Sequence, residues 1–153
     1  MALYSHRFMV YWSDTDAAGI AHFSNFFRWC ERTEEELFRS RFGSLSGLLA
    51  EAGLAFPRVK ASCNFFFPLF LHDELRVDVV EILVGEKSIT YRYEIHNESK
   101  GMKSAECEIV VVPVKLSEMR SVEIPPQIKE SLFSFGAVEK NKRVKVQEGS
   151  EGR

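Results

Sequence analysis

Apolar positions recur with two different spacings along the chain, one typical of helices and one typical of strands, and the helical spacing begins near Ser24. Arg7–Trp12 predicts a short strand, and Ser13–Phe23 predicts the loop that follows it. From Ser24 onward, apolar or small residues recur every three to four positions, which is typical of a helix with one buried face. Ser24 is the expected N-cap of this helix. Gly43 is expected to end it, because glycine readily adopts the left-handed conformation of a C-terminal cap.

A short helix over Leu45–Ala52 is expected next, and beyond Pro57 the pattern becomes that of strands. Between Ile89 and His96 every second residue is apolar, which is typical of an antiparallel strand with one buried face. A last short helix is expected within Ile124–Phe135, where two prolines stand at its start. The expected strands are Arg58–Phe67, Asp73–Val84, Ile89–His96 and Met102–Leu116.

The composition fits one folded domain. The chain has 153 residues, of which 45% are hydrophobic, and this is enough for one core. We expect a single domain over residues 1–136 and a charged, mobile tail over residues 137–153, because the tail is poor in aromatic residues. A strand, a long helix and four antiparallel strands predict an α+β fold in which one helix lies across a curled sheet.

Charge and cysteine content indicate which partners and which cellular compartment to expect. The net charge of −2 gives no reason to expect nucleic acid or an anionic membrane as a partner. The first ten residues lack the pattern of a signal peptide, and the apolar run Ile109–Val114 is too short to span a bilayer. Cys30, Cys63 and Cys107 are widely spaced, which favours reduced thiols over a disulfide framework or a zinc site. We therefore expect a cytoplasmic protein without a metal centre.

The segment 11–29, YWSDTDAAGIAHFSNFFRW, holds the main candidate for chemistry. Asp16 lies in a loop just before a helix start, where unpaired amides and the positive end of the helix dipole face a ligand. Acyl transfer needs a carboxylate that attacks or activates water, and donors that hold an oxyanion. The alternative role for Asp16 is to cap the loop or the helix. Asp14 is expected to shape the turn through hydrogen bonds.

The order of elements and the motif D-x-D-x-x-G, followed by an aromatic-rich helix start, resemble the hot-dog fold thioesterases. More narrowly, they resemble the 4-hydroxybenzoyl-CoA thioesterase-like acyl-CoA thioesterases. The resemblance covers about Ser5 to Leu116, and it includes the segments Ser62–Asn64 and Pro68–Leu75. It implies a long central helix wrapped by a curled antiparallel five-stranded sheet. The whole protein is expected to assemble as a homodimer or homotetramer. His72 departs from the resemblance, because many relatives have glycine there.

Four residues around the loop are candidates for roles in the reaction, and the resemblance implies those of Asp16 and Phe23. Asp16 corresponds to the catalytic carboxylate of the family, which acts as nucleophile or general base. The backbone N–H of Phe23 would polarise the thioester carbonyl, and Gly19 would permit a close turn beside the substrate. His22 is a further catalytic candidate that could contact the acyl group, the attacking water or Asp16; alternatively, it packs against or caps the loop.

Contacts to the substrate are expected from residues outside this loop. Asn64 is a polar residue in an otherwise apolar strand, so it either faces the site or points outward. Coenzyme A carries phosphates, which makes Arg58, Lys60, Lys87 and Ser88 candidates for its contacts. The alternative is that these residues are simply solvated.

Two other groups of reactive residues are expected to be structural. Some relatives in the resembling family have a catalytic glutamate on the long helix, which makes Glu34–Glu36 an alternative candidate. A solvated helix face is expected instead, because Arg32 and Arg39 stand close enough in sequence to pair with these residues. Cys63 is expected to be a small buried side chain, because no His–Asn or His–Asp partner set is recognisable for it.

The expected function is therefore an acyl-CoA thioesterase that hydrolyses a small aromatic or medium-chain acyl-CoA to the free acid and coenzyme A. No cofactor is expected beyond the coenzyme A of this small-molecule substrate. One alternative is a non-catalytic acyl-thioester binding module on the same scaffold. Another is a hot-dog hydratase or dehydratase, in which His22 would pair with Asp16.

Overall fold

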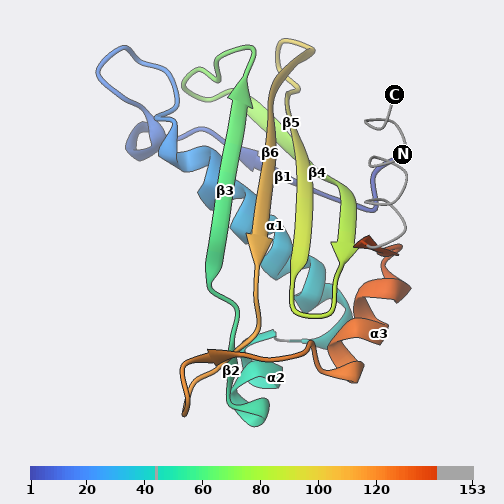
Figure 1. Cartoon of the computed structure of the whole chain (residues 1–153). Coiled ribbons are helices and arrows are strands. Elements are labelled where there is room, and N and C mark those ends of the chain that lie inside the picture. The colour runs from blue at the N-terminus through green and yellow to red at the C-terminus, as the bar shows by residue number, and fades with distance from the viewer. Residues whose placement is uncertain (44, 141–153) are drawn as a thin grey trace, which may run out of the picture.

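A computed structural model describes residues 1–43 and 45–140 of the chain. Within them, five long strands form an antiparallel sheet in the order β1-β4-β5-β6-β3. Helix α1 (Ser24–Phe42) lies across one face of this sheet, as Figure 1 shows. The expected α+β arrangement of one long helix against an antiparallel sheet is confirmed. The strand bounds are β1 Tyr4–Met9, β3 Arg58–Phe65, β4 Glu74–Val84, β5 Ile89–Asn97 and β6 Met102–Val111.

The apolar face of α1 packs against the sheet as the helical spacing predicts. Trp29, Cys30, Leu37 and Phe38 are all buried in the same core cluster as the inward side chains of the strands. Burying one large apolar side chain of this kind stabilises the fold by about 1.5–3 kcal/mol. No helix within the described part of the chain is long and apolar enough to cross a membrane.

The start of α1 differs from the expectation in its capping. The N-cap residue is Phe23, whose backbone already has helical angles (φ −56°, ψ −29°), and no side-chain hydrogen bond caps this end. Ser24 is the first helical residue, and its Oγ lies 2.8 Å from Nδ1 of His22. Ser24 is therefore not the N-cap, because a capping hydroxyl belongs to the residue before the first helical one. At the other end, Gly43 has φ 78° and donates its N–H to the carbonyl of Arg39, as expected.

Several strand boundaries differ from the expected ones. The first strand ends at Met9, and Trp12–Asp14 forms a short 3₁₀ helix instead. The long last strand is interrupted at Pro113, which has no N–H to donate to a neighbouring strand. The chain beyond it joins a small second sheet, β2-β7-β8. The remaining elements are α2 Leu45–Ala52, β2 Leu54–Ala55, β7 Val114–Lys115, β8 Arg120–Ser121 and α3 Pro126–Ser134.

The folded part continues past residue 136. Ala137 is buried in the core, and β9 (Val138–Glu139) pairs in parallel with β4, where Val138 lies opposite Leu83. The first residues of the expected mobile tail are therefore packed against the sheet. The rest of that tail, from residue 141, lies outside the described residues.

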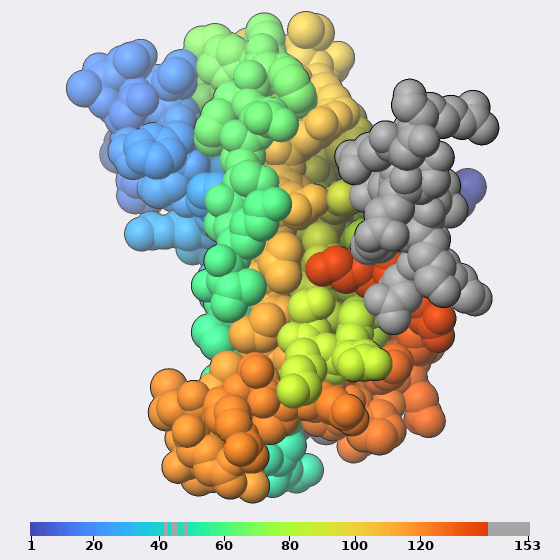
Figure 2. Space-filling view, in the orientation of Figure 1, coloured from blue at the N-terminus to red at the C-terminus, as the bar shows by residue number. Residues whose placement is uncertain are grey.

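Strand β3 forms one edge of the sheet. Among the described strands it pairs only with β6, and Figure 2 shows its residues in green on the near surface of the molecule. A bulge between Arg58 and Lys60 leaves Val59 out of the register. Arg58 therefore lies opposite Val111 on the helix side of the sheet, whereas Lys60 turns to the outer side. The edge exposes apolar side chains, because Val59 is 58% and Phe65 is 50% exposed.

Candidate active site

Asp16 lies in a tight loop that is closed by its own backbone. The Asp16 N–H donates to the carbonyl of Ile20 over 2.8 Å, and the Gly19 N–H donates to the carbonyl of Asp16 over 3.1 Å. The carboxylate Oδ1 accepts hydrogen bonds from the amides of Ala18 (2.8 Å) and Ile20 (3.4 Å). Gly19 has φ 80°, the left-handed region that glycine adopts without strain. Among the described residues, no hydrogen bond engages Oδ2, so this oxygen is available to a ligand.

The turn between β3 and β4 holds this loop in place. The Ala21 N–H donates to the carbonyl of Leu69 over 2.7 Å, and Ile20 forms an antiparallel bridge with Phe70. These bonds join the catalytic candidate to a segment some fifty residues further along the chain. The position of Asp16 therefore depends on the conformation of the turn that contains Leu69 and Phe70.

A buried carboxylate, Asp73, organises that turn. Asp73 is 5% exposed and accepts hydrogen bonds from the Phe70 amide (2.9 Å), Asn97 Nδ2 (2.7 Å) and Lys100 Nζ (2.6 Å). Burial opposes ionisation of Asp73, but the bonds from Lys100, Phe70 and Asn97 outweigh it and lower the pKa of the carboxyl group. The sequence did not indicate this network, because Asn97 and Lys100 approach Asp73 only through the pairing of β4 with β5.

Asp14 shapes the start of the loop, as expected. Its carboxylate accepts the Tyr11 N–H over 2.9 Å. Its carbonyl oxygen accepts the His22 N–H (2.8 Å) and Asn25 Nδ2 (2.7 Å). The loop and the first turn of α1 are thereby bound into one unit.

Phe23 presents an unused amide at the start of α1. Within the described residues no acceptor is found for its N–H, and the helix dipole adds positive potential at this end. His22 beside it is exposed, with Nδ1 2.8 Å from Ser24 Oγ and its ring against the ring of Phe23 at 4.6 Å between centroids. The catalytic role of His22 stays a prediction.

Asp16 and Phe23 border the same apolar cavity of about 400 Å³. The ring of Phe26 meets the ring of Phe65 edge-on at its wall, with 4.9 Å between centroids. A carboxylate oxygen, a free amide and an apolar space thus occur together, which is the set of groups that hydrolysis of an acyl thioester requires. The lining residues are Asp16, Ile20, Ala21, Phe23, Phe26, Phe65, Phe66, Phe67, Pro68 and Leu69.

None of the six residues expected at the substrate borders this cavity in one chain, and these are Gly19, Arg58, Lys60, Asn64, Lys87 and Ser88. Lys60 and Asn64 line a separate cavity on the outer side of the sheet, where Lys60 Nζ lies 3.4 Å from Glu108. Lys87 and Ser88 lie in the hairpin between β4 and β5, at the opposite end of the sheet from the Asp16 loop (Figure 1).

Arg58 is directed toward helix α1 and binds Glu34. The bulge in β3 turns Arg58 to the helix side, and its Nη2 lies 2.9 Å from Glu34 Oε2. The side chain of Glu34 is 4% exposed, so the expectation of a solvated face is wrong for this residue. Glu34 stands one helical turn after the buried Cys30, which directs it toward the sheet. Burial raises the pKa of Glu34 to about 7, although Arg58 opposes this rise.

The three cysteines are free thiols that the fold brings together. Cys63 and Cys107 face each other across β3 and β6, with 2.7 Å between their sulfur atoms. The hydrogen bond to Cys107 and burial raise the pKa of the Cys63 thiol, so it is a poor nucleophile. Within residues 1–43 and 45–140, no group of three or more His, Cys, Asp or Glu side chains has an arrangement that could hold a metal ion.

Comparison with known proteins shows which hydrolases the chain is similar to. The family model described as "Thioesterase-like superfamily" matches residues 10–132. A 1,4-dihydroxy-2-naphthoyl-CoA hydrolase of Synechocystis is 27% identical over 125 residues, which cover 82% of this chain and 91% of that protein. The corresponding hydrolase of Thermosynechococcus vestitus is 28% identical and covers 82% of this chain and 85% of its own.

Solved structures give the same result for the fold. A 1,4-dihydroxy-2-naphthoyl-CoA thioesterase from Synechocystis superposes with a TM-score of 0.77 at 26% identity, over 84% of this chain and 94% of that one. A gentisyl-coenzyme A thioesterase superposes with a TM-score of 0.70 at 24% identity, over 82% and 98% of the two chains. These neighbours have the hot-dog fold, so the expectation of that fold is confirmed.

Proposed function

Since the chain belongs to the thioesterase-like superfamily, we propose that it is an acyl-CoA thioesterase whose catalytic carboxylate is Asp16. The curated relatives it resembles are thioester hydrolases. The observation that carries the proposal is that Asp16 and the start of α1 at Phe23 border one apolar cavity. A carboxylate at that position serves hydrolysis, whereas a binding module has no need of it.

The proposed reaction uses the two groups that the loop and the helix start present. Asp16 Oδ2 attacks the thioester carbonyl carbon, or it accepts a proton from a water molecule that attacks this carbon. The Phe23 N–H donates to the carbonyl oxygen as negative charge develops on it. The C–S bond then breaks, and coenzyme A leaves as a thiolate that takes up a proton. On the nucleophilic route, water hydrolyses the resulting anhydride, so both routes yield the free acid and need no further cofactor.

The walls of the cavity support a small aromatic acyl group as substrate. Phe23, Phe26 and Phe65 offer ring faces and edges, and aromatic pairs of this kind contribute about 0.5–1.5 kcal/mol beyond the area they bury. Curated relatives are named for hydrolysis of a dihydroxynaphthoyl thioester. The hydratase alternative has less support, because it needs a histidine paired with Asp16, and Nδ1 of His22 is instead bound to Ser24.

The free edge of β3 supports assembly of two copies. An open strand edge with exposed apolar side chains is a site at which another strand can pair, and a second copy closes it symmetrically. In the proposed homodimer two β3 strands run antiparallel, and the two sheets become continuous. A tetramer would join two such dimers.

Replacement of Asp16 tests the proposed mechanism. Asp16→Asn keeps the size of the side chain and removes its nucleophilic and basic oxygen, so kcat should fall by at least about 10²-fold, whereas binding and fold remain. The measurement is thiol release from a panel of aromatic and aliphatic acyl-CoAs. Glu36→Gln is the control, because Glu36 lies on α1 outside the cavity and pairs with Arg39. Wild-type rates from Asp16→Asn on every thioester would remove Asp16 from the mechanism.

A further inference from the structure

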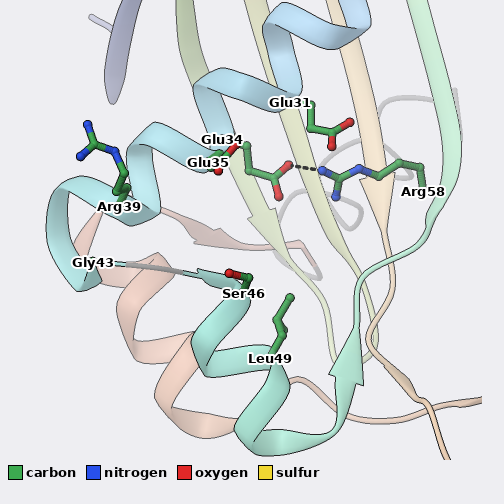
Figure 3. Close-up of a pocket in the computed structure, with 8 residues that line it drawn as sticks. All are labelled: Glu31, Glu34, Glu35, Arg39, Gly43, Ser46, Leu49 and Arg58. Carbon is green, nitrogen blue, oxygen red and sulfur yellow. Dashed lines mark hydrogen bonds and ion pairs between the residues drawn. The ribbon is translucent and has the colours of Figure 1, made fainter.

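The ion pair of the buried Glu34 and the partly exposed Arg58 lies at the wall of a second cavity. This cavity has a volume of about 210 Å³ and is enclosed by α1, α2 and the first residues of β3, as Figure 3 shows. Arg58 is 31% exposed, so part of its guanidinium group remains accessible beside the carboxylate of Glu34. Neither residue takes part in the chemistry proposed for Asp16, and they do not border its cavity within one chain.

The symmetry of a β3 pair brings the two cavities together. In an antiparallel pair, opposite residues point to the same side of the sheet. We take the pair centred on Ser62, in which Lys60 lies opposite Asn64 and both residues line the cavity on the outer side of the sheet. The same register sets Phe65 of one copy at the level of Val59 in the other, and both side chains are exposed and apolar.

The two α1 helices would also run antiparallel in this dimer, so the start of one lies toward the second half of the other. Phe65 borders the Asp16 cavity, and Arg58 borders the second one. In this proposed dimer, the Asp16 cavity of one copy would therefore adjoin the cavity of Glu34 and Arg58 in the second copy.

We propose that Glu34 and Arg58 of one subunit form the polar far end of the acyl site of the other, and that they select acyl groups carrying a hydroxyl. This inference rests on the proposed thioesterase function and on the β3 dimer. It makes Glu34 and Arg58 specificity-determining residues, whereas Asp16 and Phe23 act on the thioester itself.

The chemistry of the cavity favours a neutral hydroxyl over a charged or purely apolar end. A hydroxyl both donates and accepts, so it can donate to the Glu34 carboxylate and accept from an Arg58 N–H at once. The cavity is lined by three carboxyl groups and two guanidinium groups, so it has no excess of positive charge that would attract a carboxylate on the acyl group. A purely apolar end would displace water from the charged pair and leave without partners those N–H groups and oxygen atoms that the pair does not use between themselves.

A matched pair of thioesters tests the selectivity. Wild-type protein should hydrolyse a hydroxybenzoyl-CoA with a higher kcat/KM than benzoyl-CoA, since a site built to bind a hydroxyl discriminates against the analogue that lacks it. Glu34→Gln should reduce this ratio by about tenfold or more and change kcat/KM for benzoyl-CoA by no more than about threefold. Glu36→Gln, on the same helix, should leave the ratio unchanged.

A mixed dimer tests whether the pair acts across the interface. A heterodimer of one Asp16→Asn subunit and one Glu34→Gln subunit, isolated with two different tags, contains one site with both native residues if Glu34 serves the neighbouring subunit. It should recover the wild-type preference for the hydroxylated thioester. If Glu34 served its own subunit, the heterodimer would retain the low preference of Glu34→Gln, and the inference would be overturned.

The remaining outcomes are equally decisive. Should Glu34→Gln fail to fold, the double variant Glu34→Leu with Arg58→Leu removes both charges together, and it should show the same loss of preference. An unchanged ratio in these variants would overturn the inference but leave the proposed function intact. Failure of the wild-type protein to release thiol from any acyl-CoA would instead refute the proposed function.

Discussion

Glu34→Gln should also change how the stability of the protein depends on pH. Burial raises the pKa of Glu34 from 4.5 to about 7, against the effect of Arg58, and the neighbouring carboxylate of Glu31 adds to the rise. Between these two values the folded protein keeps a proton that the unfolded chain releases. The stabilisation from protonated Glu34 is therefore fully present below pH 4.5, and it is lost as the pH rises through about 7.

The size of the effect follows from the two pKa values. The difference between 4.5 and about 7 corresponds to about 3 kcal/mol, at about 1.4 kcal/mol per pH unit. Glutamine has nearly the same shape and does not ionise, so the variant lacks this contribution. The free energy of unfolding of the wild type, relative to Glu34→Gln, should fall by about this amount between pH 4.5 and pH 8.

Urea unfolding at several pH values and one fixed protein concentration measures this difference. Comparing the wild type with the variant cancels the contributions of the other carboxylates. Glu36→Gln is the control, because the hydrogen bond from Arg39 lowers the pKa of Glu36, and stabilisation from this residue should instead be lost as the pH falls. Parallel stability curves for the wild type and Glu34→Gln across the whole range would refute the reasoning.

Three other substitutions test the parts that position the site. Gly19→Ala should lower kcat and reduce the free energy of unfolding by about 1 kcal/mol in thermal unfolding, because φ at Gly19 is 80°. An unchanged kcat would show that the loop tolerates a side chain at this position. Asp73→Asn should lower kcat and destabilise the protein at neutral pH. Because the folded-state pKa of Asp73 is lowered, the difference in stability from the wild type should shrink as the pH falls below the ordinary pKa of 3.8. A stability difference that stays constant in acid would contradict the role of the Asp73 charge. Val59→Lys places like charges on two paired β3 edges, so it should shift the protein toward the monomer in analytical ultracentrifugation. The control variant Lys60→Ala should not cause this shift. A dimer that is unchanged in Val59→Lys would argue against pairing through β3.

The sequence alone determined the features that depend on neighbouring residues. The apolar spacing after Ser24 predicted α1 and its buried face, and the alternation from Ile89 predicted an antiparallel strand. Asp16, Gly19 and the start of α1 also lie within a few residues of one another, so their closeness follows from a single turn. Local patterns are informative here because turn geometry and hydrophobic periodicity act over short stretches of chain.

Only the tertiary structure decided the features that depend on strand pairing. The sequence predicted a solvated Glu34, but this residue lies on the sheet side of α1, and a bulge at Val59 turns Arg58 inward to bind it. Cys63 and Cys107 stand 44 residues apart and meet because β3 pairs with β6 in one particular register. A shift of register by one residue reverses every side chain of a strand, and the register is set by the packing of the whole sheet. For this reason the chain pattern located the Asp16 loop, whereas the second cavity and the open β3 edge emerged only from the assembled fold.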